Sequence, residues 1–341
     1  MKTMLALNNA ETALQTTIQR TLQFVFRFAI RLTILLVAVA AVYFSISSLV
    51  SAAPAAPAAP AAPAAPAAPA APAAKIESFK VDVSGKGQPI ILIPGLASSG
   101  DVWQGTVKQF CSAEGRYECH VLTLAGFAGV APISTPLLTS VAKELVAYVD
   151  DKKLNRPIVI GHSLGGFLAL QLGINHADKF SRLIIVDSLP ALGAVQMPDI
   201  TPEQLKSMAG RMRDSMKNQD AKSFAEGQRR SVSSMVTAPE DLERVLGWGS
   251  KSDSATVMNA MHDLLATDLR QDIARIKTPT LVLGSWYAYK DFAKRSDIEN
   301  NFKLQYQKMN GVTIELADTA KHFIMLDEPK WMFERITVFL K

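Results

Sequence analysis

The chain has 341 residues, of which 48% are hydrophobic, and it carries 36 Lys and Arg, 31 Asp and Glu, and two cysteines. This apolar content excludes wholesale disorder, and two cysteines exclude a disulfide-rich scaffold. Most of the excess positive charge is N-terminal: residues 1–74 hold four basic and one acidic residue, whereas residues 75–341 hold 32 basic and 30 acidic residues. The pI near 9.1 therefore gives no support for a nucleic-acid-binding surface.

The first predicted element is an uncharged run of 19 residues, 32–50. A helix of this length, at ~1.5 Å per residue, spans roughly the ~30 Å core of a bilayer, so a lipid bilayer is an expected partner. Arg20, Arg27 and Arg31 precede the run. The positive-inside rule thus places residues 1–31 in the cytoplasm and the chain after the run on the periplasmic or extracellular side. Two alternatives stay open: a signal peptide cleaved near residues 50–52, which would release a secreted protein, and a helix buried in a soluble protein.

Residues 51–74 form a linker of Ala-Ala-Pro repeats, with proline at every third position from Pro54 to Pro72. Proline at this spacing prevents helix and sheet hydrogen bonding and favours polyproline II, which at ~3.1 Å per residue gives a spacer of roughly 70 Å. The repeat is either a stalk that holds a domain away from a membrane or a low-complexity expansion without a selected length.

Residues 75–341 alternate short apolar runs with helical patterns, which is typical of an α/β domain whose mostly parallel sheet is covered on both faces. Residues 191–263 are the exception, because they contain no convincing strand and are rich in methionine. We expect a helical cap there. Helices are expected around 101–110, 136–151, 164–176, 296–309 and 328–340, and strands over 76–83, 90–93, 117–124, 158–160, 183–186, 280–283 and 312–316.

The sequence Gly161-His162-Ser163-Leu164-Gly165 lies between a predicted buried strand and a predicted helix. A sharp turn at this place exposes a serine hydroxyl above the sheet, and the helix N-terminus beside it stabilises negative charge. The pentapeptide alone is a weak signal, and its strand–turn–helix setting makes it strong. The alternative is a structural serine in a glycine-rich turn.

With this motif in its setting, residues 75–341 resemble the α/β-hydrolase superfamily. The resemblance implies about eight strands, a cap inserted after the sixth, and a catalytic triad in the chain order Ser, acid, His, with Ser163 as nucleophile. It also implies an oxyanion hole formed by the backbone N–H groups of Leu96 and Leu164. The family usually has His-Gly where this chain has Pro94-Gly95, but the chemistry requires only a backbone N–H, so the hole need not be lost.

His322 is the candidate general base, because it lies in the loop after the last predicted strand, at the same sheet edge as Ser163. The usual family position for the acid is the loop after strand 280–283, where no carboxylate lies at the expected offset and Asp291 comes later. Asp187, directly after strand 183–186, is the favoured acid. Asp291, or a weak or missing third member, remains the alternative, since Asp often occupies such a strand end without a catalytic role.

A serine nucleophile indicates acyl transfer through an acyl-enzyme, and the leading hypothesis is hydrolysis of a small-molecule carboxylic ester. Phe127, the aromatic residues of 286–289 and the methionine-rich cap suggest an apolar acyl pocket, although each could simply be core. Thioesters, lactones and amides remain alternatives, as does a membrane-tethered hydrolase-fold domain that binds a ligand or protein without catalysis. The sequence contains no metal-binding cluster, phosphate loop or dinucleotide fingerprint, so no metal or cofactor is expected.

Cys111 and Cys119 enclose a short loop before strand 117–124. A disulfide and two buried thiols are both compatible with this spacing. The predicted outward orientation favours the disulfide, because disulfides persist in oxidising compartments.

Overall fold

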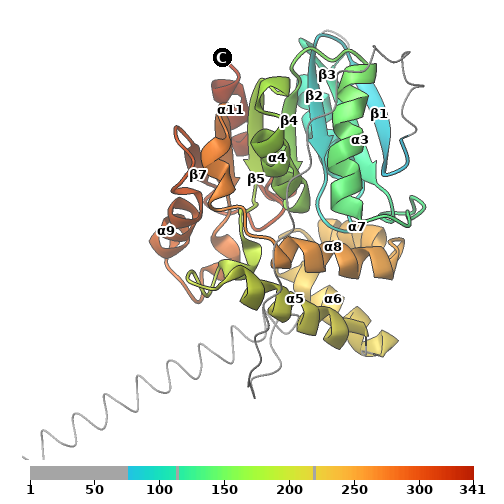
Figure 1. Cartoon of the computed structure of the whole chain (residues 1–341), viewed down its shortest axis with the longest axis vertical. Helices are drawn as coiled ribbons and strands as arrows, with labels where there is room; N and C mark the ends of the chain where they lie inside the picture. Colours follow the sequence, from blue (N-terminus) through green and yellow to red (C-terminus); the bar gives the residue numbers. More distant parts are fainter. Residues whose placement is uncertain (1–75, 113–114, 218–219) are drawn as a thin grey trace, which may run out of the picture.

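The computed structural model describes residues 76–112, 115–217 and 220–341 (Figure 1). The expected cytoplasmic segment at 1–31, membrane helix at 32–50 and Ala-Ala-Pro linker at 51–74 lie outside these residues. Within them, no helix is both long enough and apolar enough to cross a bilayer.

One sheet with the strand order β1-β3-β2-β4-β5-β6-β7 forms the centre of the domain. β1 pairs antiparallel with β3, and the other neighbouring strands are parallel. The sheet has seven strands among the described residues, so the expectation of eight strands is wrong for this part of the chain. The strands are β1 Phe79–Gly85, β2 Gln88–Ile93, β3 Tyr117–Leu124, β4 Ile158–His162, β5 Arg182–Val186, β6 Thr280–Gly284 and β7 Thr313–Leu316.

Both faces of the sheet are buried, because successive side chains of a strand point to opposite faces and each face has its own layer of helices. Ile91 and Ile93 of β2 belong to one apolar cluster, with residues of α3, α4 and α9. Ile90 and Leu92 belong to a second cluster, with residues of α2, α10 and α11. These helices are α2 Gln104–Phe110, α3 Leu137–Asp151, α4 Leu164–Asn175, α9 Arg295–Tyr306, α10 Ile324–Asp327 and α11 Pro329–Phe339.

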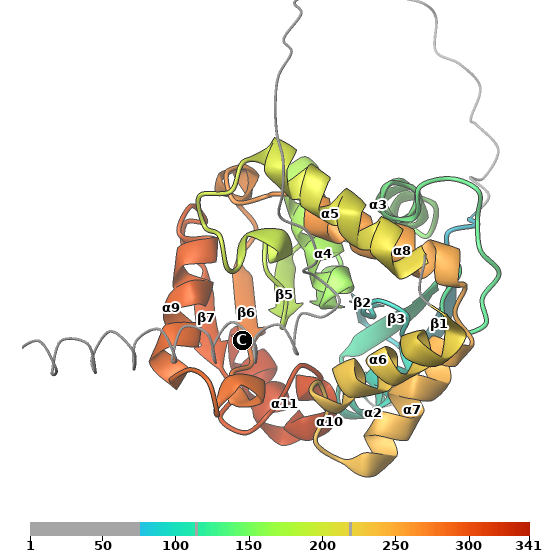
Figure 2. The ribbon, with the colours of Figure 1, turned by 90° about the horizontal axis from the view of Figure 1, so that it is seen from below.

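Between β5 and β6 the described residues form four α-helices, here called the cap helices: α5 Pro202–Lys217, α6 Ala221–Ser233, α7 Pro239–Ser250 and α8 Ser254–Ala266. They lie beyond the carboxyl ends of the parallel strands (Figure 1). Figure 2 shows that they form two pairs, α5 with α8 and α6 with α7. Leu264 of α8 belongs to the first apolar cluster, whereas Val232 of α6 and Trp248 of α7 belong to the second. The cap is thus attached to both layers of the domain.

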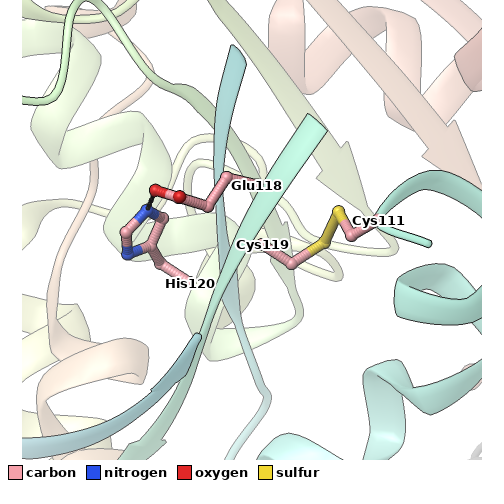
Figure 3. Close-up of a disulfide and its surroundings, with 4 residues drawn as sticks. All are labelled: Cys111, Glu118, Cys119 and His120. Atoms are coloured by element: carbon pink, nitrogen blue, oxygen red, sulfur yellow. Dashed lines mark hydrogen bonds and ion pairs between the residues drawn. A yellow bond between two sulfur atoms is a disulfide. The ribbon is translucent and has the colours of Figure 1, made fainter. Parts of the chain in front are cut away.

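A disulfide joins Cys111, which follows α2, to Cys119 in β3. Figure 3 shows Cys119 on one face of β3 and its neighbours Glu118 and His120 on the other face, as strand alternation requires. On that other face, the ring nitrogens of buried His120 lie 2.8 Å from the Tyr148 hydroxyl and 2.9 Å from a Glu118 carboxylate oxygen. His120 is therefore a core residue, and it is not part of the site expected around Ser163 and His322 at the carboxyl edge of the sheet.

Candidate active site

Ser163 occupies the turn between β4 and α4, with φ 52° and ψ −118°. This left-handed backbone is costly for a residue with a side chain, and such strain is concentrated at functional positions. The flanking glycines are needed for space. A Cβ on Gly161 would lie 2.1 Å from the Gly165 carbonyl oxygen, and a Cβ on Gly165 would lie 2.3 Å from the Ile93 carbonyl oxygen. The glycines therefore allow a close approach of main chains, while the serine itself adopts the strained conformation.

The candidate base and the favoured candidate acid are in direct contact. Nδ1 of His322 lies 2.6 Å from Oδ2 of Asp187, and the two side chains are 26% and 11% exposed. Asp187 also has a left-handed backbone, with φ 45°, and its N–H donates to the Leu283 carbonyl at 2.7 Å. These features aim its carboxylate at the loop that carries His322.

Ser285, directly after β6, holds the Asp187 carboxylate from the other side. Its backbone N–H donates to Oδ1 at 2.7 Å, and its hydroxyl donates to Oδ2 at 3.0 Å. Sequence reasoning missed Ser285, although it follows the predicted strand at the place where the family usually carries its acid. The feature of the sequence that could have indicated Ser285 is its side-chain hydroxyl directly after that strand.

Asp291, the alternative acid, lies away from His322. Its side chain is 71% exposed and pairs with the neighbouring Lys290 at 3.0 Å. The structure therefore brings Asp187 to His322, and it does not bring Asp291 there.

The loop after β2 carries Leu96, one of the expected oxyanion donors. Ala97 has φ 53°, and the Ser98 N–H donates to the Gly95 carbonyl at 3.3 Å, so the loop is a tight turn. A Cβ on Gly95 would lie 3.3 Å from Cβ of Ser163, which shows how closely this loop passes the candidate nucleophile. Leu164, the second expected donor, begins α4, so its N–H has no partner within the helix.

His162 is fully buried and lies against His322, with ring centroids 4.6 Å apart. Burial, and secondly the neighbouring His322 imidazole, holds the pKa of His162 well below its ordinary value of 6.5. The neutral ring uses Nε2–H to donate to the His322 carbonyl at 3.1 Å, while Nδ1 has no partner in the described part of the chain. His162 and His322 are 160 residues apart in the chain, so local sequence does not indicate this contact.

Two tyrosines lie near the carboxylate of Asp187. Burial, and secondly the Asp187 charge, raises the pKa of Tyr289 to about 12 and that of Tyr306 well above 10. The Tyr306 hydroxyl donates to the Ser188 carbonyl at 2.7 Å. Both phenols therefore stay neutral at physiological pH, and Tyr306 fixes the main chain next to Asp187.

Two of the aromatic residues expected to line an apolar acyl pocket pack against the core. Phe127 is 0% exposed and belongs to the core, so it does not line an open acyl pocket. Trp286 is partly buried and packs against the same core. Across residues 76–112, 115–217 and 220–341, no group of three or more His, Cys, Asp or Glu side chains could hold a metal ion.

Comparisons with known proteins place the chain among hydrolases. The sequence model of the alpha/beta hydrolase family matches residues 90–335. The pimeloyl-(acyl-carrier protein) methyl ester esterase of Vibrio atlanticus is 34% identical over 116 residues, which cover 34% of this chain but only 42% of that enzyme. The corresponding enzyme of Nitrosomonas europaea is 25% identical over 213 residues, covering 60% of this chain and 79% of that enzyme.

The fold is similar to that of a solved esterase from Exiguobacterium antarcticum. That structure aligns with a TM-score of 0.64 and 19% identity, over 78% of this chain and 98% of its own. At this identity the likeness supports the fold, and the family match over residues 90–335 supports the relationship. The chain therefore belongs to the alpha/beta hydrolase family and is a hydrolase.

Proposed function

We propose that the chain is a serine hydrolase that cleaves carboxylic esters through an acyl-enzyme on Ser163. The observation that carries this proposal is the contact of His322 Nδ1 with Asp187 at 2.6 Å, at the sheet edge where Ser163 occupies a strained turn. With Nδ1 bound to a carboxylate, the proton-free position of the neutral ring is Nε2, and the carboxylate stabilises the imidazolium that forms when Nε2 accepts a proton.

In the proposed reaction, Oγ of Ser163 attacks the ester carbonyl while its proton passes to Nε2 of His322. The N–H groups of Leu96 and Leu164 stabilise the resulting oxyanion. His322 then gives its proton to the departing alkoxide, which leaves as the alcohol. Water attacks the acyl-enzyme, His322 takes its proton, and the acid is released as that proton returns to Ser163.

The proposed substrate is a small ester with an apolar acyl group. Two relatives are esterases by name, which supports the ester bond as the target. Leu96, one of the proposed oxyanion donors, has a partly buried apolar side chain that packs against the core beside the nucleophile turn. Apolar and aromatic lining is the usual basis for recognising an acyl chain. Thioesters, lactones and amides require the same groups, and a substrate panel distinguishes them.

We further propose that residues 32–50 anchor the domain on the outer side of a membrane, with the Ala-Ala-Pro linker as spacer. The bonded pair Cys111 and Cys119 supports an oxidising compartment. Carbonate washing of membranes and protease treatment of spheroplasts test this location. A chain extracted by carbonate, or protected from protease added to spheroplasts, would contradict it.

The experiment for the activity uses the full-length chain, a fluorophosphonate probe and p-nitrophenyl esters of increasing acyl length. We expect labelling of Ser163 and ester hydrolysis, and Ser163→Ala should abolish labelling and lower kcat by about a thousandfold or more. Ser215→Ala, at an exposed serine of α5, is the matched control and should behave like the wild type. A folded wild-type chain that is neither labelled nor active on any ester would contradict the proposal.

A further inference from the structure

The loop that carries His322 is bound to the cap through Lys321. The Lys321 ammonium donates to the carbonyl of Ser233 at 3.0 Å and to that of Val236 at 2.8 Å. Ser233 is the last residue of α6, and Val236 lies in the connection to α7 formed by residues 234–238, here called the cap connection. Carbonyls at a helix C-terminus lack intrahelical partners and carry partial negative charge, so a lysine from a distant segment satisfies them.

Three further hydrogen bonds reinforce this attachment. The Phe323 N–H donates to the Met235 carbonyl at 3.2 Å. Asp327 accepts from the Thr237 N–H through Oδ1 at 2.9 Å and from the Lys321 N–H through Oδ2 at 2.8 Å. Residues on both sides of His322 are therefore fixed to the cap connection.

These contacts limit how the His322 ring can move. Its carbonyl accepts from His162 and its Nδ1 contacts Asp187, while Lys321 and Phe323 are held by the cap connection. Among the residues that the structure describes, Nε2 of His322 has no hydrogen-bond partner. The orientation of Nε2 is thus determined by the nucleophile turn, by the loop after β5 and by the cap together.

We propose that Lys321 is a positioning residue for His322, through which the α6–α7 half of the cap holds the general base. The inference rests on the proposed role of His322. Its physical basis is that a misplacement of about 1 Å between reacting groups can cost on the order of a hundredfold in rate. If Lys321 only stabilised the cap or shaped the substrate pocket, its loss would change thermal stability or KM and would leave kcat unchanged.

The test compares wild type, Lys321→Met and Lys321→Arg in the full-length chain on one p-nitrophenyl ester. Methionine keeps much of the side-chain volume and removes the ammonium. We expect kcat to fall about tenfold or more with KM changed by less than about twofold. Arginine can donate to both carbonyls, so Lys321→Arg should recover kcat to within about threefold of wild type. Lys330→Met, at an exposed lysine of α11, is the matched control and should equal wild type.

A wild-type kcat in Lys321→Met, or a change confined to KM, would overturn the inference, as would a Lys321→Arg chain as slow as Lys321→Met. If Lys321→Met does not fold, Lys321→Gln decides, because it removes the positive charge and shortens the reach to the two carbonyls while keeping a polar side chain. A kcat several-fold below wild type would then support the inference, and an unchanged kcat would overturn it. If the wild type neither hydrolyses esters nor reacts with the fluorophosphonate, the proposed function fails and the inference fails with it.

Discussion

The loops after β5 and β6 lie side by side at the carboxyl edge of the sheet, and they differ in what they bring to His322. The loop after β5 brings the Asp187 carboxylate, whereas the loop after β6 brings Ser285, which donates twice to that carboxylate. A buried carboxylate needs hydrogen-bond donors for its oxygens, and the imidazole supplies only one. The acid position is therefore shared, because one strand end carries the carboxylate and the neighbouring strand end supplies further hydrogen-bond donors to it.

The largest effect is expected for Asp187→Asn, which removes the charge that the loop after β5 brings to His322. An amide at this position cannot stabilise the imidazolium and favours the wrong tautomer of His322, so we expect kcat to fall by about a thousandfold or more with little change in KM. The measurement is steady-state ester hydrolysis. Asp291→Asn is the matched control and should stay within about twofold of wild type, because its carboxylate is 71% exposed and pairs with the neighbouring Lys290. A large loss in the control alone would transfer the role to Asp291.

Ser285→Ala tests the contribution of the loop after β6, which supplies two hydrogen bonds to the Asp187 carboxylate. It removes the hydroxyl donor to Oδ2 of Asp187 and keeps the backbone donor to Oδ1, so we expect kcat to fall about tenfold, less than in Asp187→Asn. Ser181→Ala is a suitable control, since the buried Ser181 hydroxyl has no partner among the described residues. If Ser285→Ala and Ser181→Ala have the same kcat, the loop after β6 does not contribute to the acid.

A smaller effect is expected at His162, which contacts His322 from the nucleophile turn. Because burial lowers its pKa in the folded chain, the unfolded chain binds the proton first as the pH falls below 6.5. Folding stability should therefore be lost from about pH 6.5 downward, with a slope of at most ~1.4 kcal/mol per pH unit from this group. Chemical denaturation between pH 7.5 and 5 should show a shallower slope for His162→Gln than for wild type.

His120→Gln is the comparison variant for this measurement. Burial also lowers the pKa of His120, but Glu118 opposes that shift through a hydrogen bond and its charge. The same substitution there should remove less of the slope. Equal slopes in wild type and His162→Gln would show that His162 does not titrate differently in the folded and unfolded chains.

Much of the sheet was predictable from local pattern. A buried parallel strand is a short apolar run bounded by turn residues, and all seven predicted runs correspond to the seven strands. The nucleophile turn was predictable for the same reason, because Gly161 to Gly165 are contiguous in the chain. The extra strand taken from the family resemblance is absent from the described residues.

The support of the site was not predictable, because it depends on contacts between residues far apart in the chain. Ser285 and Asp187 are 98 residues apart, Asp187 and His322 are 135 apart, and Lys321 and Ser233 are 88 apart. Hydroxyl, ammonium and backbone groups occur in most loops, so their presence in the sequence does not indicate which of them meet. The sequence favours Asp187 and leaves Asp291 as the alternative acid, and the solvent-exposed position of the Asp291 carboxylate decides between them.

Local sequence is enough to predict the class of fold, the position of Ser163 and the candidacy of His322, because each depends on residues that are adjacent in the chain or on the end of a recognisable strand. Three contacts become visible in the folded chain: Asp187 rather than Asp291 meets His322, Ser285 donates to the Asp187 carboxylate, and Lys321 binds the cap to the loop of His322. The physical reason is that hydrogen bonds act over about 3 Å, and only the folded chain brings such distant groups within that range.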